Sequence, residues 1–160
     1  MRVLLSLGSN IGNSREMVRA AMTEIERTIL SDTLRSQMWL TDPVGYTDQP
    51  PFINAAIVGS SDLSAQEIHD RCKNIENQLG RQQRERWRER EIDIDVILVG
   101  DVIVDDGDLH IPHARMEERR FVLAPCQEIA PEMVSPRTGM SIGELLNVCP
   151  DTSSVAIAEG

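Results

Sequence analysis

The order in which strand-like and helix-like segments follow one another constrains the fold of this chain more than any other feature of its sequence. Residues 3–7 are a short apolar run that stops at a turn cluster, which predicts a strand. Residues 14–29 carry apolar side chains at helical spacing, and Ser14 is suited to cap a helix there. Residues 33–41 and 53–58 predict two further strands.

The next part of the chain adds a second helix and a fourth strand. Residues 64–67 read Ser-Ala-Gln-Glu, a capping-box pattern that opens a helix, and Gly80 is well placed to end it. Residues 92–99 predict the strongest strand. The order strand–helix–strand–strand–helix–strand predicts an α+β, ferredoxin-like (split βαβ) fold, in which helices pack on an antiparallel sheet.

Shorter elements are expected after this unit. Gly100 and Asp101 suggest a hairpin turn into a strand over residues 102–104. Short helices are predicted around residues 117–124 and after Ser141, which has a glutamate three residues later. Residues 150–160 are expected to be a loose tail.

Length, charge and cysteine content narrow the class of protein. The 160 residues suit a single domain over residues 1–160, and a net charge of −10 argues against a general nucleic-acid binder. No apolar run approaches the roughly 20 residues that cross a bilayer, and no signal-peptide segment follows the first residue. The three cysteines form no C-x-x-C pair. We therefore expect a cytoplasmic protein without nucleic-acid or membrane partners, as a monomer or weak dimer.

An alternating acidic segment is the first candidate for chemistry. Glu91, Asp93 and Asp95 lie at every second position, so in a strand they share one face, with Cα atoms about 7 Å apart. Carboxylates so placed can hold two ions about 3.5–4 Å apart. The alternative is a strand whose polar face meets water, but like charges on one face repel and need a cation to offset them. Oxygen ligands favour Mg²⁺ or Mn²⁺.

Basic residues cluster beside this acidic segment. Residues 81–90 contain five arginines and Trp87, and guanidinium groups bind phosphate oxygens in pairs. A solvated charged loop is the alternative, yet beside a metal pair the run favours a polyphosphate ligand. His113 is expected to contact a phosphate or a nucleobase, a metal pair with His110 is disfavoured, and His69 is expected to be structural.

Five segments together resemble the 6-hydroxymethyl-7,8-dihydropterin pyrophosphokinase family of folate biosynthesis. The resemblance covers residues 1–146, its segments come in the family's order, and the family's fold is the ferredoxin-like one. The segments are Gly8-Ser9-Asn10-Ile11-Gly12; Asp48 to Ala55; Glu76 with Leu79-Gly80-Arg81; Arg86-Trp87 with Arg90 to Asp95; and Pro112-His113 to Phe121.

This resemblance implies transfer of pyrophosphate from ATP to the hydroxymethyl oxygen of the pterin, with release of AMP. It implies Arg81, Arg90, Asp93 and Asp95 as catalytic residues, with both aspartates holding two Mg²⁺ ions. The residues implied for ATP binding are Glu76, Arg86, Trp87, Ile97, His113 and Arg119. Those implied for the pterin are Thr41, Val44, Phe52, Asn54 and Phe121, with the ring stacked between the two phenylalanines.

The sequence departs from the family's pattern at Arg88-Glu89, where Gly-Pro is usual, and at Gln83, where an arginine is usual. Loops near residues 9–13, 42–51 and 81–90 are expected to order around ATP and exclude water. Two other classes remain open on the residues alone. A ferredoxin-like binding module would show no joint effect of Mg²⁺ and ATP, and a metal-dependent phosphohydrolase would release inorganic phosphate.

Overall fold

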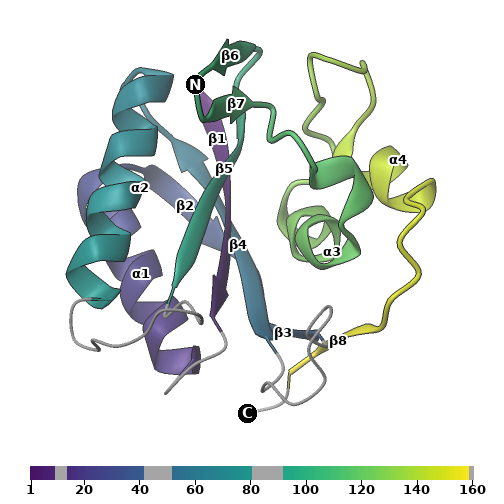
Figure 1. Cartoon of the computed structure of the whole chain (residues 1–160), viewed down its shortest axis with the longest axis horizontal. Helices are drawn as coiled ribbons and strands as arrows, with labels where there is room; N and C mark the ends of the chain where they lie inside the picture. The colour runs from purple at the N-terminus through teal and green to yellow at the C-terminus, as the bar shows by residue number, and fades with distance from the viewer. Residues whose placement is uncertain (10–13, 42–51, 81–91, 159–160) are drawn as a thin grey trace.

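The computed structural model describes residues 1–9, 14–41, 52–80 and 92–158. An antiparallel sheet lies between two layers of helices (Figure 1). Helices α1 (Ser14–Thr28) and α2 (Ala65–Gly80) cover one face, and α3 (Arg120–Ile129) and α4 (Ile142–Asn147) lie on the other side.

The sheet has six strands in the order β5-β1-β4-β3-β8, with β2 also paired to β4. Every pairing is antiparallel. Its strands are β1 (Arg2–Ser9), β2 (Ser31–Arg35), β3 (Trp39–Thr41), β4 (Phe52–Ser60), β5 (Asp93–Val99) and β8 (Val155–Ile157). Strand β1 lies between β4 and β5, which is the arrangement of a split βαβ unit. The predicted ferredoxin-like fold is confirmed.

Alternation along the central strand builds two apolar cores. Val3, Leu5 and Leu7 of β1 are buried against the α1 and α2 side, whereas Leu4 belongs to the cluster on the α3 side. Helix α1 contributes a buried stripe at helical spacing, made of Val18, Ala21, Met22 and Ile25. The two faces of the sheet are therefore both covered, and a site on either face has to be left open by small or polar residues.

A β-bulge in β5 sets which side chains face the site. Strand β1 pairs with Val96 and with Leu98, so Ile97 has no partner there and the alternation reverses. Ile97 and Leu98 consequently both pack in the α3-side core. Before the bulge, Asp93 and Asp95 face the α3 side, opposite the residues between them, which are buried under α1 and α2.

Two strand predictions need correction. The strand expected over residues 102–104 is wrong: β6 (Val104–Asp106) pairs with β7 (Leu109–Ile111) in a separate hairpin. Gly107 turns this hairpin at φ +60°, a conformation that favours glycine. The single strand expected over residues 33–41 is divided into β2 and β3. Between them the Ser36 hydroxyl accepts a hydrogen bond from the Ala56 N–H at 2.8 Å, so a side chain interrupts the strand pairing.

The C-terminal part of the chain is more ordered than predicted. The predicted loose tail over residues 150–160 is wrong for residues 155–157. These residues form β8, which pairs with β3 along the edge of β3 that faces away from β4. The helix expected at residues 117–124 is a short 3₁₀ turn, η1 (Met116–Glu118), followed by α3. The capping box at Ser141 is confirmed at the start of α4. No helix in the described ranges is long and apolar enough to span a membrane.

Candidate active site

A cavity of about 590 Å³ lies on the α3 side of the sheet, over β1, β4 and β5. It brings together side chains from strands that are far apart in sequence and from the first turn of α3. Seven residues that the sequence predicted for the site line it: Thr41, Phe52, Asn54, Asp93, Asp95, Arg119 and Phe121.

The two aspartates stand on β5 above a part of the sheet with small side chains. Asp93 pairs with Gly8 and Asp95 with Ser6, so little bulk rises from β1 beside the carboxylates. Among the described residues no group of three or more His, Cys, Asp or Glu side chains could hold a metal. Two carboxylates, with water and phosphate oxygens completing the coordination, are the ligands that Mg²⁺ takes in phosphate-transfer sites. The pair therefore fits Mg²⁺ held jointly with a phosphate ligand.

The buried amide of Asn54 lies on β4, the strand that pairs with β1 on the side away from β5. Asn54 Nδ2 donates a hydrogen bond to Thr41 Oγ1 at 2.7 Å, and both side chains are buried. Gly8 makes room for this amide, because a Cβ at Gly8 would lie 2.8 Å from Asn54 Oδ1. The hydrogen bond and the close approach together hold the amide in one orientation at the cavity wall.

Aromatic side chains reach the same cavity from two elements. Phe52 begins β4 and Phe121 lies in the first turn of α3, and both are half-buried. The Arg119 guanidinium lies 5.8 Å from the centre of the Phe121 ring, within the range of a cation–π contact. The cavity thus offers flat apolar surface beside a fixed amide, a combination that suits a small heterocycle.

A second cavity, of about 410 Å³, lies along the edge of β5 that faces away from β1. Asp95 lines both cavities, which places the carboxylate at their junction. The other side chains of the second cavity come from α2, β5 and the β6–β7 hairpin with the residues after it; they include His69, Lys73, Val96, Asp108, His110 and His113.

His113 lies where the two cavities meet. Its Nε2 is 3.9 Å from Asp95 Oδ2, and its Nδ1 accepts a hydrogen bond from the Arg115 N–H at 3.3 Å. Burial lowers the pKa of His113, while Asp95 acts in the opposite direction and Arg119 lowers it further. Because Nδ1 accepts, the neutral ring carries its proton on Nε2, toward Asp95.

Glu76 anchors the edge of β5. Its Oε2 accepts a hydrogen bond from the Ile94 N–H at 2.7 Å, and its Oε1 lies 3.2 Å from Lys73 Nζ. Burial raises the pKa of Glu76, while the bond from Ile94 works against that rise. Both carboxylate oxygens are engaged within the protein, so Glu76 positions the strand that carries the aspartates.

The Ile97 side chain lines neither cavity, although the Ile97 carbonyl accepts a hydrogen bond from the His113 N–H at 3.1 Å. The bulge turns the fully buried Ile97 side chain into the α3-side core, and Val96 lines the second cavity in its place. His69, expected to be structural, also lines that cavity. The expectations for Val44, Arg81, Arg86, Trp87 and Arg90 fall outside the described residues.

Sequence reasoning also missed Asp151, which lies in the segment expected to be loose. Asp151 lines the first cavity, and its Oδ2 accepts a hydrogen bond from the Arg120 N–H at 3.0 Å. Hydrogen bonds from Ser153, and then the bond from Arg120, lower the pKa of Asp151. Asp151 therefore caps the start of α3, the turn that carries Arg119 and Phe121. Asp151 and Arg120 are 31 positions apart in the sequence, so no local sequence pattern indicates this capping contact.

A family model for 7,8-dihydro-6-hydroxymethylpterin-pyrophosphokinase (HPPK) matches residues 4–131. The chain belongs to this family. A 2-amino-4-hydroxy-6-hydroxymethyldihydropteridine pyrophosphokinase of Pseudomonas aeruginosa is 35% identical over 150 residues, which cover 93% of this chain and 92% of that protein. The protein of the same name from Bacillus subtilis is 37% identical over 139 residues, 84% of this chain and 83% of that one.

Solved structures agree on the HPPK fold. A Plasmodium falciparum HPPK-DHPS structure with pterin and p-hydrobenzoate superposes with a TM-score of 0.68 at 14% identity. The match covers 91% of this chain and 44% of the Plasmodium chain, so this chain spans less than half of that protein. At this identity the likeness shows the fold, and the site has to be argued from the residues of this HPPK chain.

Proposed function

We propose that this chain transfers the pyrophosphoryl group of ATP to the hydroxymethyl oxygen of 6-hydroxymethyl-7,8-dihydropterin in folate biosynthesis, releasing AMP. The observation that carries the proposal is the place of Asp95 at the junction of two cavities. One cavity suits a flat heterocycle and the other a nucleotide. A transfer between two substrates requires their reacting groups to meet at one point, and a carboxylate that holds a cation there serves both.

The first cavity is the proposed pterin site. Phe52 and Phe121 supply aromatic faces for stacking, and Asn54, with Thr41 behind it, supplies an amide edge that matches the ring nitrogens and carbonyl of a pterin. Val44 is proposed to complete this site. The volume of about 590 Å³ lies within the range of small-molecule sites.

The second cavity is the proposed nucleotide site. The Ile94 N–H points to the edge of β5 that faces away from β1, where Glu76 accepts it, so the backbone of Val96, two residues on, faces the same edge. The N–H and C=O groups of a strand edge match the edge of a nucleobase. His113, which lines this cavity, and Arg119, which lines the first, are proposed to contact the nucleotide, as are Arg86 and Trp87.

The phosphate chain is proposed to lie over Asp93 and Asp95, which would hold two Mg²⁺ ions. Bound Mg²⁺ supplies neutralisation of the triphosphate and of the charge that develops in transfer. Arg81 and Arg90 are proposed to add guanidinium contacts to the same oxygens. His113 Nε2 lies 3.9 Å from Asp95 Oδ2, and its N–H is proposed to donate to the nucleotide at this point. We also propose a cytoplasmic enzyme that works as a monomer or weak dimer.

The test is product analysis of the purified protein with ATP, MgCl₂ and the pterin. AMP should appear in step with a pyrophosphorylated pterin, because attack occurs at the β-phosphorus. ADP would indicate an ordinary kinase, and inorganic phosphate without a pterin product would indicate a phosphohydrolase. Asp95→Ala should abolish turnover in a folded protein, whereas Asp62→Ala, an exposed acid outside both cavities, should not. Normal turnover by folded Asp95→Ala would refute the metal site.

A further inference from the structure

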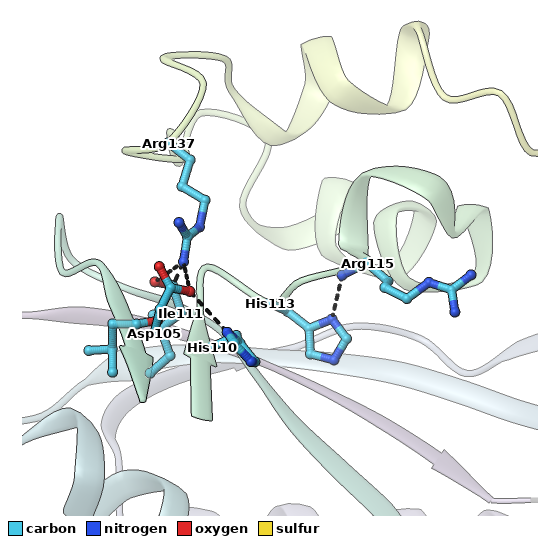
Figure 2. A network of polar contacts seen from close by, with 7 residues as sticks. Asp105, His110, Ile111, His113, Arg115 and Arg137 are labelled. Atoms are coloured by element: carbon cyan, nitrogen blue, oxygen red, sulfur yellow. Dashed lines mark hydrogen bonds and ion pairs between the residues drawn. The ribbon is translucent and has the colours of Figure 1, made fainter. Parts of the chain in front are cut away.

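All three histidines of the chain line the second cavity. His110 differs from the other two because it belongs to a polar network on the β6–β7 hairpin (Figure 2). The network joins the hairpin to an arginine from the loop between α3 and α4. Asp105 and Arg137, which form the rest of it, line neither of the two cavities, and only His110 does.

The network centres on Asp105. Arg137 Nη2 donates to Asp105 Oδ1 at 2.6 Å and lies 3.3 Å from the carbonyl oxygens of Val104 and Ile111. The same Asp105 oxygen lies 2.9 Å from His110 Nδ1. Val104 and Ile111 are partners in the hairpin, so a single guanidinium ties together both strands and the carboxylate that holds the histidine (Figure 2).

This network determines which nitrogen of His110 carries the proton. Hydrogen bonds from Arg137 and then from His110 lower the pKa of Asp105, so the carboxyl group is ionised. An ionised carboxylate only accepts hydrogen bonds, which places the His110 proton on Nδ1. In the neutral ring, Nε2 is then an unprotonated acceptor.

Orientation, rather than stability, is what the network provides. The side chains of Asp105 and His110 are 53% and 43% exposed, and exposed ion pairs add little to the free energy of unfolding. Packing alone would leave a ring this exposed free to turn. Arg137 Nη2 donates to the carboxylate at 2.6 Å and shares its two N–H groups with the two hairpin carbonyls at 3.3 Å, which holds the carboxylate against the hairpin and, through it, the ring.

We propose that Arg137 and Asp105 are positioning residues that hold His110 Nε2 as a hydrogen-bond acceptor for the nucleoside part of ATP. The donor is a ribose hydroxyl or the exocyclic amino group of the base. This inference rests on the proposed nucleotide site in the second cavity.

Two observations favour the nucleoside over the phosphates as the partner of His110. Ionised phosphate oxygens carry no donor for an unprotonated Nε2. The hairpin also places acidic groups around the ring, since Asp108 lines the cavity and Asp105 holds the histidine, which disfavours a phosphate there. On the α2 wall, Lys73 is paired with Glu76. Asp95, the proposed phosphate and metal anchor, lines the same cavity, so a nucleotide can reach both.

The test is equilibrium binding of the magnesium complex of α,β-methylene ATP, which cannot be cleaved where AMP would leave. His110→Ala should weaken binding about threefold to tenfold, as expected for one net hydrogen bond of about 1 kcal/mol. Arg137→Ala should weaken it less, and should have no added effect in the His110→Ala background. Arg27→Ala, an exposed arginine whose ion partner is Glu24, is the matched control and should bind as the wild type does.

Asp105→Ala provides a readout that a merely structural role would not change. Without the carboxylate nothing fixes the proton of the neutral ring on Nδ1, so His110 should populate both tautomers and lose part of its Nε2 acceptor. Long-range ¹⁵N spectra of His110 should show the Nδ1–H form in the wild type and a mixture of both forms in Asp105→Ala, which should also bind less tightly. Thermal melts identify any variant that fails to fold.

Analogues identify the donor. The 2′-deoxy, 3′-deoxy and 6-deamino forms of the nucleotide each lack one candidate, and the form without the true donor should bind equally to wild type and His110→Ala. Unchanged affinity in folded His110→Ala, or an unchanged tautomer and affinity in Asp105→Ala, overturns the inference. A protein that binds the nucleotide but makes no pterin product overturns only the proposed function, whereas no nucleotide binding at all overturns both.

Discussion

The substitution Gly8→Ala should disturb the proposed pterin site by displacing one buried side chain, that of Asn54. Gly8 lies in β1 between Asn54 and Asp93, and an alanine Cβ there would approach Asn54 Oδ1 to 2.8 Å. Carbon and oxygen atoms that are not bonded do not come this close, so the amide has to move. Since Asn54 also donates to Thr41 at 2.7 Å, the movement breaks a buried hydrogen bond.

The size of the effect follows from that bond. Leaving a buried polar group without its partner costs about 1–3 kcal/mol of the free energy of unfolding. For a protein of this size, this loss lowers Tm by about 2–4 °C per kcal/mol. The displaced amide should also raise the KM for the pterin about tenfold, which corresponds to about 1.4 kcal/mol, and leave the KM for ATP unchanged.

A double-mutant cycle tests the reasoning. In an Asn54→Ala background the clashing oxygen is absent, and the next contact of an alanine at position 8 is the Ile53 carbonyl oxygen at an ordinary 3.9 Å. Gly8→Ala should then cost nothing, or stabilise by about 0.5 kcal/mol through the lower entropy of the unfolded chain. Gly143→Ala, whose added Cβ would lie 3.5 Å from its nearest neighbour, is the control and should keep both Tm and KM. An equal loss of Tm in both backgrounds would refute the proposed clash.

Two further predictions concern the C-terminal segment and the thiols. Hydrogen bonds, first from Ser153, lower the pKa of Asp151, so the stability it contributes is present above its unfolded pKa and lost as the pH falls. The Tm difference between wild type and Asp151→Asn should be constant near neutral pH and shrink below about pH 4. Burial raises the pKa of Cys72 and Cys126 to about 12, so an alkylating reagent at pH 8 should modify only Cys149, which is half-buried, until the protein unfolds.

Each of these two predictions would be refuted by one result. A Tm difference for Asp151→Asn that is the same at pH 3 and pH 7 would mean that the charge does not cap α3. The modified thiols are identified by mass spectrometry of the peptides. Rapid modification of either buried thiol in the folded protein would mean that the core around it opens readily.

Local patterns in the sequence predicted most of the sheet and part of the site. The period of two in β5 placed Asp93 and Asp95 on one face, and the capping sequence at Ser141 placed the start of α4. These predictions succeeded because strand alternation and helix capping involve residues within about four positions of one another. The resemblance to a family supplied residues such as Thr41 and Asn54, whose contact joins two strands.

The sequence by itself therefore determined the order of the split βαβ core, the fold class and the shared face of Asp93 and Asp95. Tertiary structure alone decided that a bulge turns the Ile97 side chain into the α3-side core, that Asp151 caps α3 from 31 positions away, and that Arg137 reaches Asp105 from 32 positions away. The physical reason is range. The pattern of buried residues and its period can be read from neighbouring residues of one segment. A polar contact between distant loops instead depends on how whole elements pack, and the sequence around an exposed acid or arginine does not indicate its partner.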